Sequence, residues 1–264
     1  MKSQIFTHNG SSTVNQSPKH FKWDFIGNAG VYDFYIDGDV HLGVKNKLDG
    51  NKKMLWTLES PFFNNGVFEY IKNNLSLVLD VFDIIFTYNE ELLPLSEKFQ
   101  FMPSMGSWIK EPKIHDKKKL ISMITSNKTF TEQQKFRVDF ANKHKDKIDV
   151  FGRGFNEILN KEDGLNDYMF SVCIENATMD TYFTEKILDC FATGTIPIYK
   201  GTKKILNYFD PEGIIFLDDI DIDDLTYDLY LSKIKNINNN FINATKFMLP
   251  EDIIYDIIKE KKII

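Results

Sequence analysis

The sequence predicts an α/β protein with parallel sheets, divided into two domains. Short apolar runs alternate with polar, helix-like stretches along most of the chain. After residue 120 a strand–helix–strand order occurs twice, and right-handed crossovers turn such an order into a parallel sheet. The stretch 103–112 contains two prolines and other turn formers, and it separates the two alternating regions. The predicted domains are therefore residues 1–105 and 106–264.

Length and composition fit this prediction and exclude several other classes. The 264 residues suit one large domain or two small ones, and 42% hydrophobic with 27% charged residues is typical of a globular protein. The formal net charge is −6, whereas nucleic-acid binders carry basic faces, so no nucleic-acid partner is expected. No stretch reaches the ~20 apolar residues that span a bilayer, and no signal-peptide core precedes the first strand. Cys173 and Cys190 fit reduced, buried thiols, so we expect a cytoplasmic protein.

In the N-terminal domain, three apolar runs predict strands, at residues 31–36, 53–58 and 82–88. Residues 66–79 have a helical pattern and predict one helix between the last two strands. The domain is therefore expected to contain a strand–helix–strand unit of its own.

In the C-terminal domain, five apolar runs predict strands: residues 120–125, 148–151, 168–174, 195–199 and 214–217. A first helix is predicted to begin at a capping box of Thr129 with Glu132 and to end near His144. A second helix is predicted over residues 181–192, stopped by Gly194.

A terminal helix is predicted in residues 247–264, because isoleucines at 253, 254, 257 and 258 share one face. Its polar side carries both signs of charge, which favours core packing over membrane binding. This helix is assigned to the C-terminal domain.

Ligands of parallel α/β sheets bind beyond the carboxyl ends of the strands. The functional residues are therefore expected directly after Thr125, Phe151, Ile174 and Tyr199. The third of these ends is followed by the first turn of a helix, where free N–H groups and a partial positive charge attract anions. Lys186 in that turn opposes the helix dipole, which suggests an anion nearby. An ion pair between Lys186 and Glu185 or another carboxylate is the simpler alternative, and the pattern alone favours it.

Three other charged residues have a functional and a structural interpretation. Arg137 lies inside the helix after the first strand of the domain, where a solvated charge is the default. Arg153 stands between two glycines, which suit both a close backbone approach to a ligand and an ordinary turn. Glu59 ends an apolar strand before Pro61, where a carboxylate could act as a general base, or equally as a capping or salt-bridging group.

Metal binding is not expected. Asp37-Gly-Asp39 has the form of a triplet that can hold a divalent cation, but Asp-Gly is also a common turn, and we favour the turn. The five histidines show no metal-ligand spacing, and the acidic stretch 218–224 is typical of a solvated loop.

Residues 168–201, YMFSVCIENATMDTYFTEKILDCFATGTIPIYKG, resemble the signature of the α1,3/4-fucosyltransferases, glycosyltransferase family ten. Order and spacing follow the family pattern Y-x-F-x-x-x-F-E-N-S, Y-x-T-E-K and x-P-x-x-x-G. The elements MITSN (123–127), Arg137, IDVFGR (148–153) and WTLESP (56–61) also look like family elements. The resemblance covers about residues 56–217 and is strongest after residue 120.

The resemblance implies a GT-B-like architecture of two Rossmann-like domains, the N-terminal one short and building the acceptor side. It implies metal-independent transfer of L-fucose from GDP-fucose to a hydroxyl of an oligosaccharide acceptor, with inversion and an α1,3/4-type linkage. In this reading Glu59 is the base, and Arg137 and Lys186 hold the diphosphate. The remaining donor-site residues are Ser126, Asn127, Glu175, Asn176, Tyr182 and Glu185.

Two departures from the family pattern are Ile174 in place of Phe and Ala177 in place of Ser. Three rival functions stay open. The first is a GT-B transferase for another nucleotide sugar, since Arg and Lys recognise a diphosphate and not a base or sugar. The second is a catalytically silent nucleotide-sugar or glycan-binding protein. The third is a metal-dependent transferase that uses Asp37 and Asp39.

Overall fold

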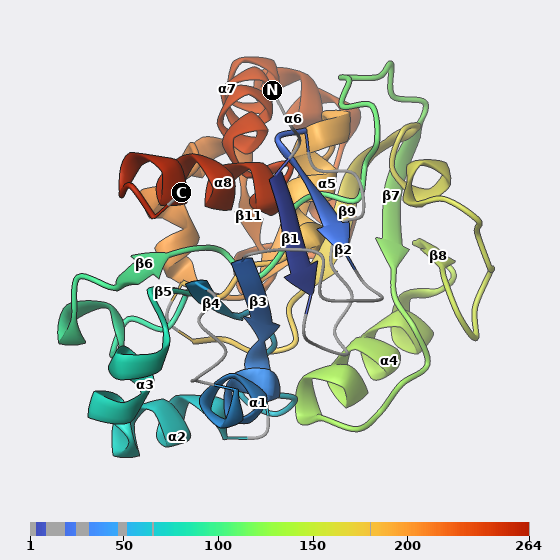
Figure 1. Cartoon of the computed structure of the whole chain (residues 1–264). Coiled ribbons are helices and arrows are strands. Elements are labelled where there is room, and N and C mark those ends of the chain that lie inside the picture. The colour runs from blue at the N-terminus through green and yellow to red at the C-terminus, as the bar shows by residue number, and fades with distance from the viewer. Residues whose placement is uncertain are drawn as a thin grey trace. The chain divides into compact units, whose positions relative to one another are not determined.

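The computed structural model describes residues 4–8, 19–24, 32–46, 52–64, 66–179 and 181–263 (Figure 1). The chain forms two compact units. Unit 1 consists of Met1–Ser104 together with Leu249–Ile264, and unit 2 of Met105–Met248. Each unit contains one parallel sheet, as the alternation of apolar and polar stretches predicts.

Among the described residues, the sheet of unit 1 has six strands in the order β2-β1-β3-β4-β5-β6, and every pairing is parallel. The strands are β1 (Gln4–His8), β2 (Phe21–Asp24), β3 (Tyr32–Ile36), β4 (Lys52–Thr57), β5 (Ile84–Thr87) and β6 (Phe99–Phe101). The helices are α1 (Val40–Lys45), α2 (Val67–Asn73), α3 (Leu75–Val81) and α8 (Pro250–Glu260). The three strands expected in this part of the chain are confirmed as β3, β4 and β5. Strands β1, β2 and β6 were not expected, because each has only five, four or three residues and none contains a long apolar run.

The single helix expected over residues 66–79 is wrong, because the segment forms two helices that meet at Asn74. This residue leaves helical geometry with φ −124° and ψ 31°. Its side-chain amide donates to the carbonyl oxygen of Tyr70 at 2.9 Å. Asparagine side chains compete with the helix for backbone groups in this way, which divides the segment into α2 and α3.

The terminal helix α8 belongs to unit 1, so its assignment to the C-terminal domain is wrong. The shared isoleucine face is confirmed: Ile254 and Ile258 are fully buried in a cluster with Phe34, Met54 and Phe86 of strands β3, β4 and β5. The chain thus returns to its first sheet because that sheet has an apolar face that α8 covers.

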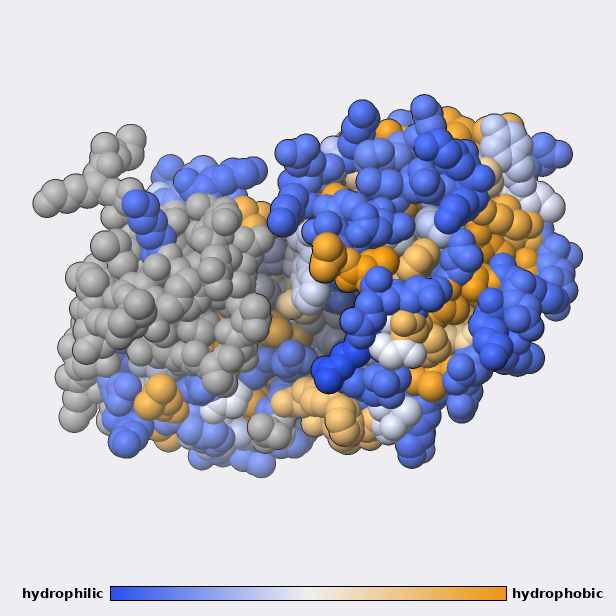
Figure 2. Space-filling view, turned by 90° about the vertical axis from the view of Figure 1, so that its right-hand side faces the viewer, coloured by the Kyte–Doolittle hydropathy of each residue, from blue (hydrophilic) through white to orange (hydrophobic). Residues whose placement is uncertain are grey.

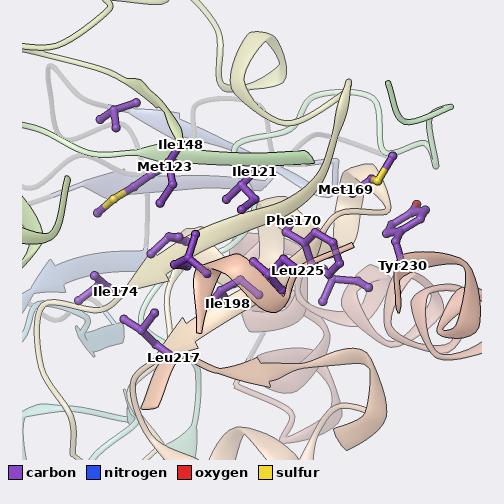
Figure 3. Packing of buried hydrophobic residues seen from close by; sticks show 14 of the residues in the cluster. Ile121, Met123, Ile148, Met169, Phe170, Ile174, Ile198, Leu217, Leu225 and Tyr230 are labelled. Atoms are coloured by element: carbon purple, nitrogen blue, oxygen red, sulfur yellow. The ribbon is translucent and has the colours of Figure 1, made fainter. Parts of the chain in front are cut away.

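The sheet of unit 2 has five strands in the order β11-β10-β9-β7-β8, again all parallel. The strands are β7 (Lys119–Ile124), β8 (Asp149–Phe151), β9 (Tyr168–Ile174), β10 (Ile196–Lys200) and β11 (Ile215–Phe216), and all five were expected. The helices are α4 (Glu132–His144), α5 (Glu185–Thr193), α6 (Tyr227–Ser232) and α7 (Ile234–Ala244). The central strand β9 is buried at all seven positions, and its apolar side chains anchor the core in Figure 3.

The ends of two helices differ from the expected ends. Helix α4 begins with a capping box of Thr131 and Gln134 in place of Thr129 and Glu132, and it ends at His144 as expected. Helix α5 begins at Glu185, four residues later than expected, because Thr184 is its N-cap. Gly194 ends α5 with φ 74°, a left-handed conformation that glycine adopts readily, which confirms the predicted stop.

The residues coloured by hydropathy on the face drawn in Figure 2 are mostly hydrophilic, with smaller apolar patches between them. Within the part of the chain that the structure describes, no helix is both long and apolar enough to cross a bilayer.

Candidate functional site

The candidate site begins where β9 ends, at Glu175, whose side chain has no exposed surface. The backbone N–H of Thr184 donates to Oε1 of Glu175 at 3.0 Å, and the Thr184 hydroxyl donates to Oε2 at 2.7 Å. These two bonds join the end of β9 to the N-cap of α5. The loop between them is therefore closed at its base by one buried carboxylate.

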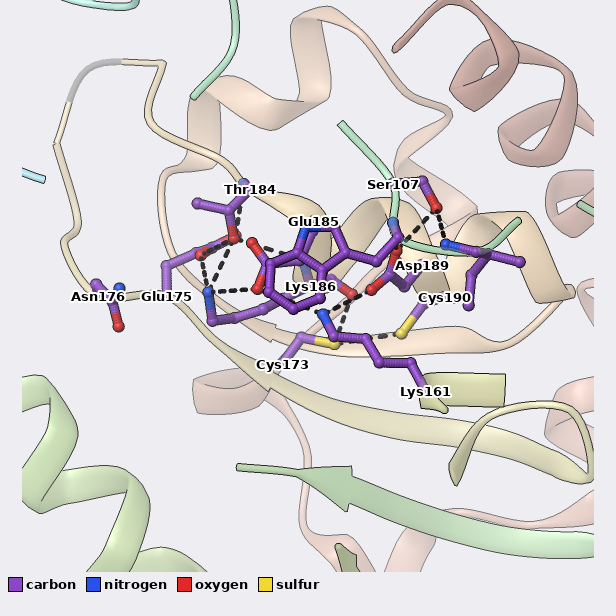
Figure 4. Close-up of polar contacts among 12 residues, drawn as sticks. Ser107, Lys161, Cys173, Glu175, Asn176, Thr184, Glu185, Lys186, Asp189 and Cys190 are labelled. Carbon is purple, nitrogen blue, oxygen red and sulfur yellow. Dashed lines mark hydrogen bonds and ion pairs between the residues drawn. The ribbon is translucent and has the colours of Figure 1, made fainter. Parts of the chain in front are cut away.

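A chain of alternating charges runs from Glu175 along the first turns of α5 (Figure 4). The ammonium group of Lys186 lies 3.4 Å from Glu175 and 3.3 Å from Glu185. The ammonium group of Lys161 lies 3.4 Å from Glu185 and 2.7 Å from Asp189. Each of the two lysines thus stands between two carboxylates. Buried ions of one sign are costly, so this alternation is what allows five charges to be enclosed together.

Asp189 connects this chain of charges to the beginning of unit 2. Its Oδ1 accepts the Ser107 hydroxyl at 2.8 Å and the Trp108 backbone N–H at 2.7 Å. The Trp108 ring lies 4.3 Å from the ammonium group of Lys161, a cation–π distance. Segment 107–108 is therefore fixed against α5 by one carboxylate and one cation.

Arg137 approaches the same strand end from α4. It is 8% exposed, so the interpretation as a solvated helix charge is wrong. Its Nη2 donates to the side-chain oxygen of Asn176 at 2.9 Å, and Nη1 donates to the carbonyl oxygen of Ile174 at 3.5 Å. The Nε atom of Arg137 is buried and has no hydrogen-bond partner among the described residues.

Burial and ion pairing shift the pKa values of this cluster in different directions. Burial raises the pKa of Glu175 and of Asp189, although Lys186 and Lys161 respectively oppose the shift. Burial also acts to raise the pKa of Glu185. The positive charges of Lys186 and Lys161 outweigh this effect and hold the pKa of Glu185 below its usual value. Both lysines have a raised pKa in spite of burial, because carboxylates surround them. Both therefore stay protonated at neutral pH.

The formal charges of the cluster cancel. Its cations are Arg137, Lys161 and Lys186, and its carboxylates are Glu175, Glu185 and Asp189. Fully ionised, this set is neutral before any ligand binds. The positive charges of Arg137 and Lys186 are already balanced by the carboxylates of the cluster. An anion that binds to these two side chains must therefore compete with those carboxylates.

The other residues expected in the donor site lie at neighbouring strand ends of the same sheet. Tyr182 is 2% exposed and close enough to Arg137 to raise its pKa, although burial lowers that pKa overall. Ser126 and Asn127 follow β7, and the Asn127 N–H donates to the carbonyl oxygen of Arg153 after β8 at 2.9 Å. A Cβ added at Gly154 would stand 2.5 Å from Asn127 Cγ, so the glycine is required for this close approach.

Glu59, the expected base, lies in unit 1 just beyond β4 and is half-buried. Its backbone N–H donates to Oδ2 of Asp37 at 3.1 Å, and its carbonyl oxygen accepts the Tyr88 hydroxyl at 2.7 Å. The backbone of Glu59 is therefore held on both sides. The triplet Asp37–Asp39 forms a short 3-10 turn, as expected.

Sequence reasoning missed Thr184, Lys161 and Asp189. Thr184 had a readable signal, since threonine directly before an acidic first turn is a typical N-cap. Asp189 also had one, because it is the only charged residue in the part of α5 that follows Lys186. Lys161 had none, because it stands in the polar stretch NKEDG, where any lysine would be expected to be solvated.

Among the residues that the structure describes, no three His, Cys, Asp or Glu side chains are grouped so that they could hold a metal ion. The two cysteines Cys173 and Cys190 are buried and free, with their sulfur atoms 3.3 Å apart.

Fold and site together define an α/β protein with two parallel-sheet units and a buried cluster of paired charges at the carboxyl edge of one sheet. The model of glycosyltransferase family 10 (fucosyltransferase), C-terminal part, matches residues 114–251, just over half of the chain. The chain belongs to this family.

Two curated relatives match shorter stretches. An alpha-(1,3)-fucosyltransferase, FucT, of Helicobacter pylori is 36% identical over 85 residues, which is 31% of this chain and 18% of that protein. An alpha-(1,4)-fucosyltransferase of Arabidopsis thaliana is 31% identical over 51 residues, 19% of this chain and 13% of that protein. The matched stretches thus span less than a fifth of the length of either relative.

One solved structure, a crystal structure of an alpha1,3-fucosyltransferase, shares the fold. It has a TM-score of 0.51 at 18% identity and covers 92% of this chain and 80% of its own. The α/β, GT-B-like fold class is thereby confirmed.

Proposed function

We propose that this chain is an inverting fucosyltransferase that moves L-fucose from GDP-fucose to a hydroxyl group of an oligosaccharide, with an α1,3/4-type linkage. The observation that carries the proposal is the cluster of Arg137, Glu175, Glu185 and Lys186 at the end of β9. It lies inside the stretch that matches the family model. A cytoplasmic location is part of the same proposal.

The leaving group of this reaction is GDP, on which negative charge increases as the bond to the sugar breaks. In this proposal Arg137 and Lys186 stabilise that charge, and the N–H groups of the first turn of α5 add to the stabilisation. Because Lys186 keeps a raised pKa, it is a cation at neutral pH. These two side chains supply the positive charge that a divalent metal supplies in other transferases, so no metal is required by this mechanism.

Transfer requires that the acceptor oxygen forms a bond to C1 of fucose while the bond from C1 to the β-phosphate oxygen breaks. Glu59 takes the proton of the acceptor hydroxyl during this step. Attack from the face opposite GDP inverts the configuration at C1, and the transition state resembles an oxocarbenium ion. Ser126, Asn127, Asn176 and Tyr182 complete the donor pocket in this proposal.

The experiment that tests the donor is thermal stabilisation by GDP, UDP, ADP and CMP at equal concentrations. A nucleotide at about 100 times its Kd adds roughly 2.7 kcal/mol of stability, so selective stabilisation by GDP is expected. Selective stabilisation by UDP would favour a transferase for another nucleotide sugar. No stabilisation by any nucleotide, together with no release of GDP from GDP-fucose in the presence of an oligosaccharide panel, would favour a catalytically silent glycan-binding protein without a donor site.

A further inference from the structure

Asp37 has an unusual backbone for a residue that is not glycine. It directly follows β3, has φ 46° in the left-handed region, and is 4% exposed. Left-handed residues other than glycine are uncommon, and the asparagine and aspartate side chains tolerate this region best. Such conformations persist where surrounding contacts impose them, and they gather at functional sites.

The contacts that hold Asp37 are made by its carboxylate. The Leu58 N–H donates to Oδ1 at 2.9 Å, and the Glu59 N–H donates to Oδ2 at 3.1 Å. Strands β3 and β4 are neighbours, with Ile36 opposite Trp56, so the residues after each strand meet at the same edge of the sheet. Asp37 therefore bridges two adjacent strand ends and uses both of its oxygens for the peptide that leads into Glu59.

The next strand holds the other side of the same peptide segment. Tyr88 follows β5, is fully buried, and donates its hydroxyl to the Glu59 carbonyl oxygen at 2.7 Å. Ser104 donates its hydroxyl to the Leu58 carbonyl oxygen. Leu58 and Glu59 are thus fixed through both N–H groups and both carbonyl groups, by side chains from the strand ends on either side of β4 and from the segment after β6.

A carboxylate is an expensive group to use for this purpose. Burial raises the pKa of Asp37 to about 7, and the carboxylates of Glu59 and Asp39 add to the shift, while the two N–H bonds oppose it. An asparagine or a serine would accept an N–H bond here at lower cost. This costly carboxylate of Asp37 holds the peptide of Glu59, the proposed base, whose placement would matter for proton transfer.

We propose that Asp37 is a positioning residue for Glu59: it fixes the Leu58–Glu59 peptide, and with it the origin of the Glu59 side chain, at the carboxyl edge of the unit 1 sheet. This inference rests on the proposed function, in which Glu59 is the base. A displacement of about 1 Å in a group that takes part in the chemistry can reduce the rate about a hundredfold, so a positioning residue affects kcat.

The test uses variants that can keep the left-handed backbone. Asp37→Gly removes both acceptor oxygens and suits φ 46° without strain. Asp37→Asn keeps one acceptor oxygen at nearly the same shape. Asp39→Asn is the matched control, because it removes a neighbouring charge of the same turn and leaves the two N–H bonds in place. Amide hydrogen exchange at Leu58 and Glu59, GDP affinity by calorimetry, and kcat with GDP-fucose are measured on each.

The expected result for Asp37→Gly is exchange at least about tenfold faster at the amides of Leu58 and Glu59, with Leu55 in β4 unchanged. Its kcat falls about tenfold to a hundredfold, whereas GDP affinity stays within about twofold of the wild type. Asp37→Asn shows a smaller effect of the same kind, and Asp39→Asn behaves as the wild type. A purely structural role would lower the melting temperature and leave kcat per folded molecule unchanged.

Two results overturn the inference: wild-type exchange rates at Leu58 and Glu59 in Asp37→Gly, or wild-type kcat in Asp37→Gly while Glu59→Gln is inactive. Failure of the proposed function has a different signature. Wild-type turnover by Glu59→Gln would remove Glu59 as the base and the catalytic part of this inference with it, and the exchange rates would still decide whether Asp37 holds the peptide.

Discussion

Two glutamates stand directly beyond parallel strands, one in each unit, and they are held in opposite ways. Glu175 after β9 is held through its side chain, since both carboxylate oxygens accept bonds from Thr184 and Oε2 also pairs with Lys186. Glu59 after β4 is held through its backbone, by Asp37 and Tyr88. Glu175 is buried and Glu59 half-buried. The difference teaches that a residue at the same strand-end position can be fixed either through its side chain or through its peptide groups.

Which group is held decides the role. A carboxylate whose oxygens are both occupied by neighbours of the same chain is a structural bridge, and here it fixes the loop before α5. In a residue whose peptide groups are fixed, the Cα atom, from which the side chain extends, has a defined position. In the proposed function Glu59 acts as the base and Glu175 supports the donor site, and each prediction below can break or sharpen that division.

The largest effect is expected from Glu59→Gln. The amide keeps the shape of the side chain but cannot take up the proton of the attacking hydroxyl group. The kcat should therefore fall by about 10² to 10⁴, the usual contribution of a general base. GDP affinity should stay within about twofold. Single-turnover kinetics with GDP-fucose and calorimetry with GDP measure the two quantities separately, and the variant Glu69→Gln, an exposed glutamate of α2, is the control. Turnover at the wild-type rate in Glu59→Gln would show that Glu59 is not the base, and the two glutamates would then not differ in role as proposed.

Lys186→Ala should affect the opposite property, donor binding. The substitution removes one cation of the anion site and leaves Glu175 and Glu185 with fewer partners, so GDP affinity should fall about tenfold to a hundredfold. Loss of one partner of a buried ion pair typically costs about 3–5 kcal/mol of stability. Calorimetry with GDP and urea unfolding measure these losses. Lys118→Ala, an exposed lysine that pairs with Asp167 at the other end of β7, should change neither.

Sequence reasoning predicted one part of this site and missed another, for a physical reason. The apolar strands of unit 2 are local features, and β9 was predicted to the residue. Arg137 and Lys186 were expected from the family pattern, and the structure brings both to the end of β9. Partners such as Lys161 come from a polar loop distant in sequence, and only the folded chain brings its ammonium group to Asp189. The terminal helix was assigned to the wrong unit for the same reason, since its isoleucine face does not specify which sheet it will cover.

The beginning of α5 shows the same limit at a smaller scale. Tyr182 and Phe183 are aromatic and continue the apolar pattern of α5 toward the N-terminus, so the sequence predicted an earlier helix start. Both side chains are buried in the structure. The structure instead uses them as core side chains of a loop, because the bonds between Thr184 and Glu175 fix that loop before the helix begins. A pattern of apolar residues alone does not distinguish the first turn of a helix from a loop with buried side chains.

Asp37 provides a pH test of how the unit 1 glutamate is supported. Burial raises its pKa from 3.8 to about 7, so the folded protein retains a proton that the unfolded chain releases above about pH 4. Stability from this group is fully present below pH 4 and is lost as pH rises to about 7, by roughly 4 kcal/mol at most. In Asp37→Asn this part of the slope should vanish. Urea unfolding from pH 4 to 8 measures it, and an unchanged slope in the variant would show that Asp37 is not the group that titrates.

The smallest effect concerns the start of α4, the helix that carries Arg137 to the site. Thr131 accepts the Gln134 N–H at 3.1 Å, and the Gln134 side chain reaches back to the Thr131 N–H, which completes a capping box. Thr131→Ala should therefore cost about 1 kcal/mol of stability, as loss of a helix cap does. Thr129→Ala, at the exposed position where the sequence suggested the cap, should change stability by less than about 0.5 kcal/mol. Because α4 positions Arg137 and leaves Glu59 untouched, GDP affinity in Thr131→Ala should fall slightly and kcat at saturating GDP-fucose should not. The reverse pattern would mean that α4 supports the chemical step as well as the donor.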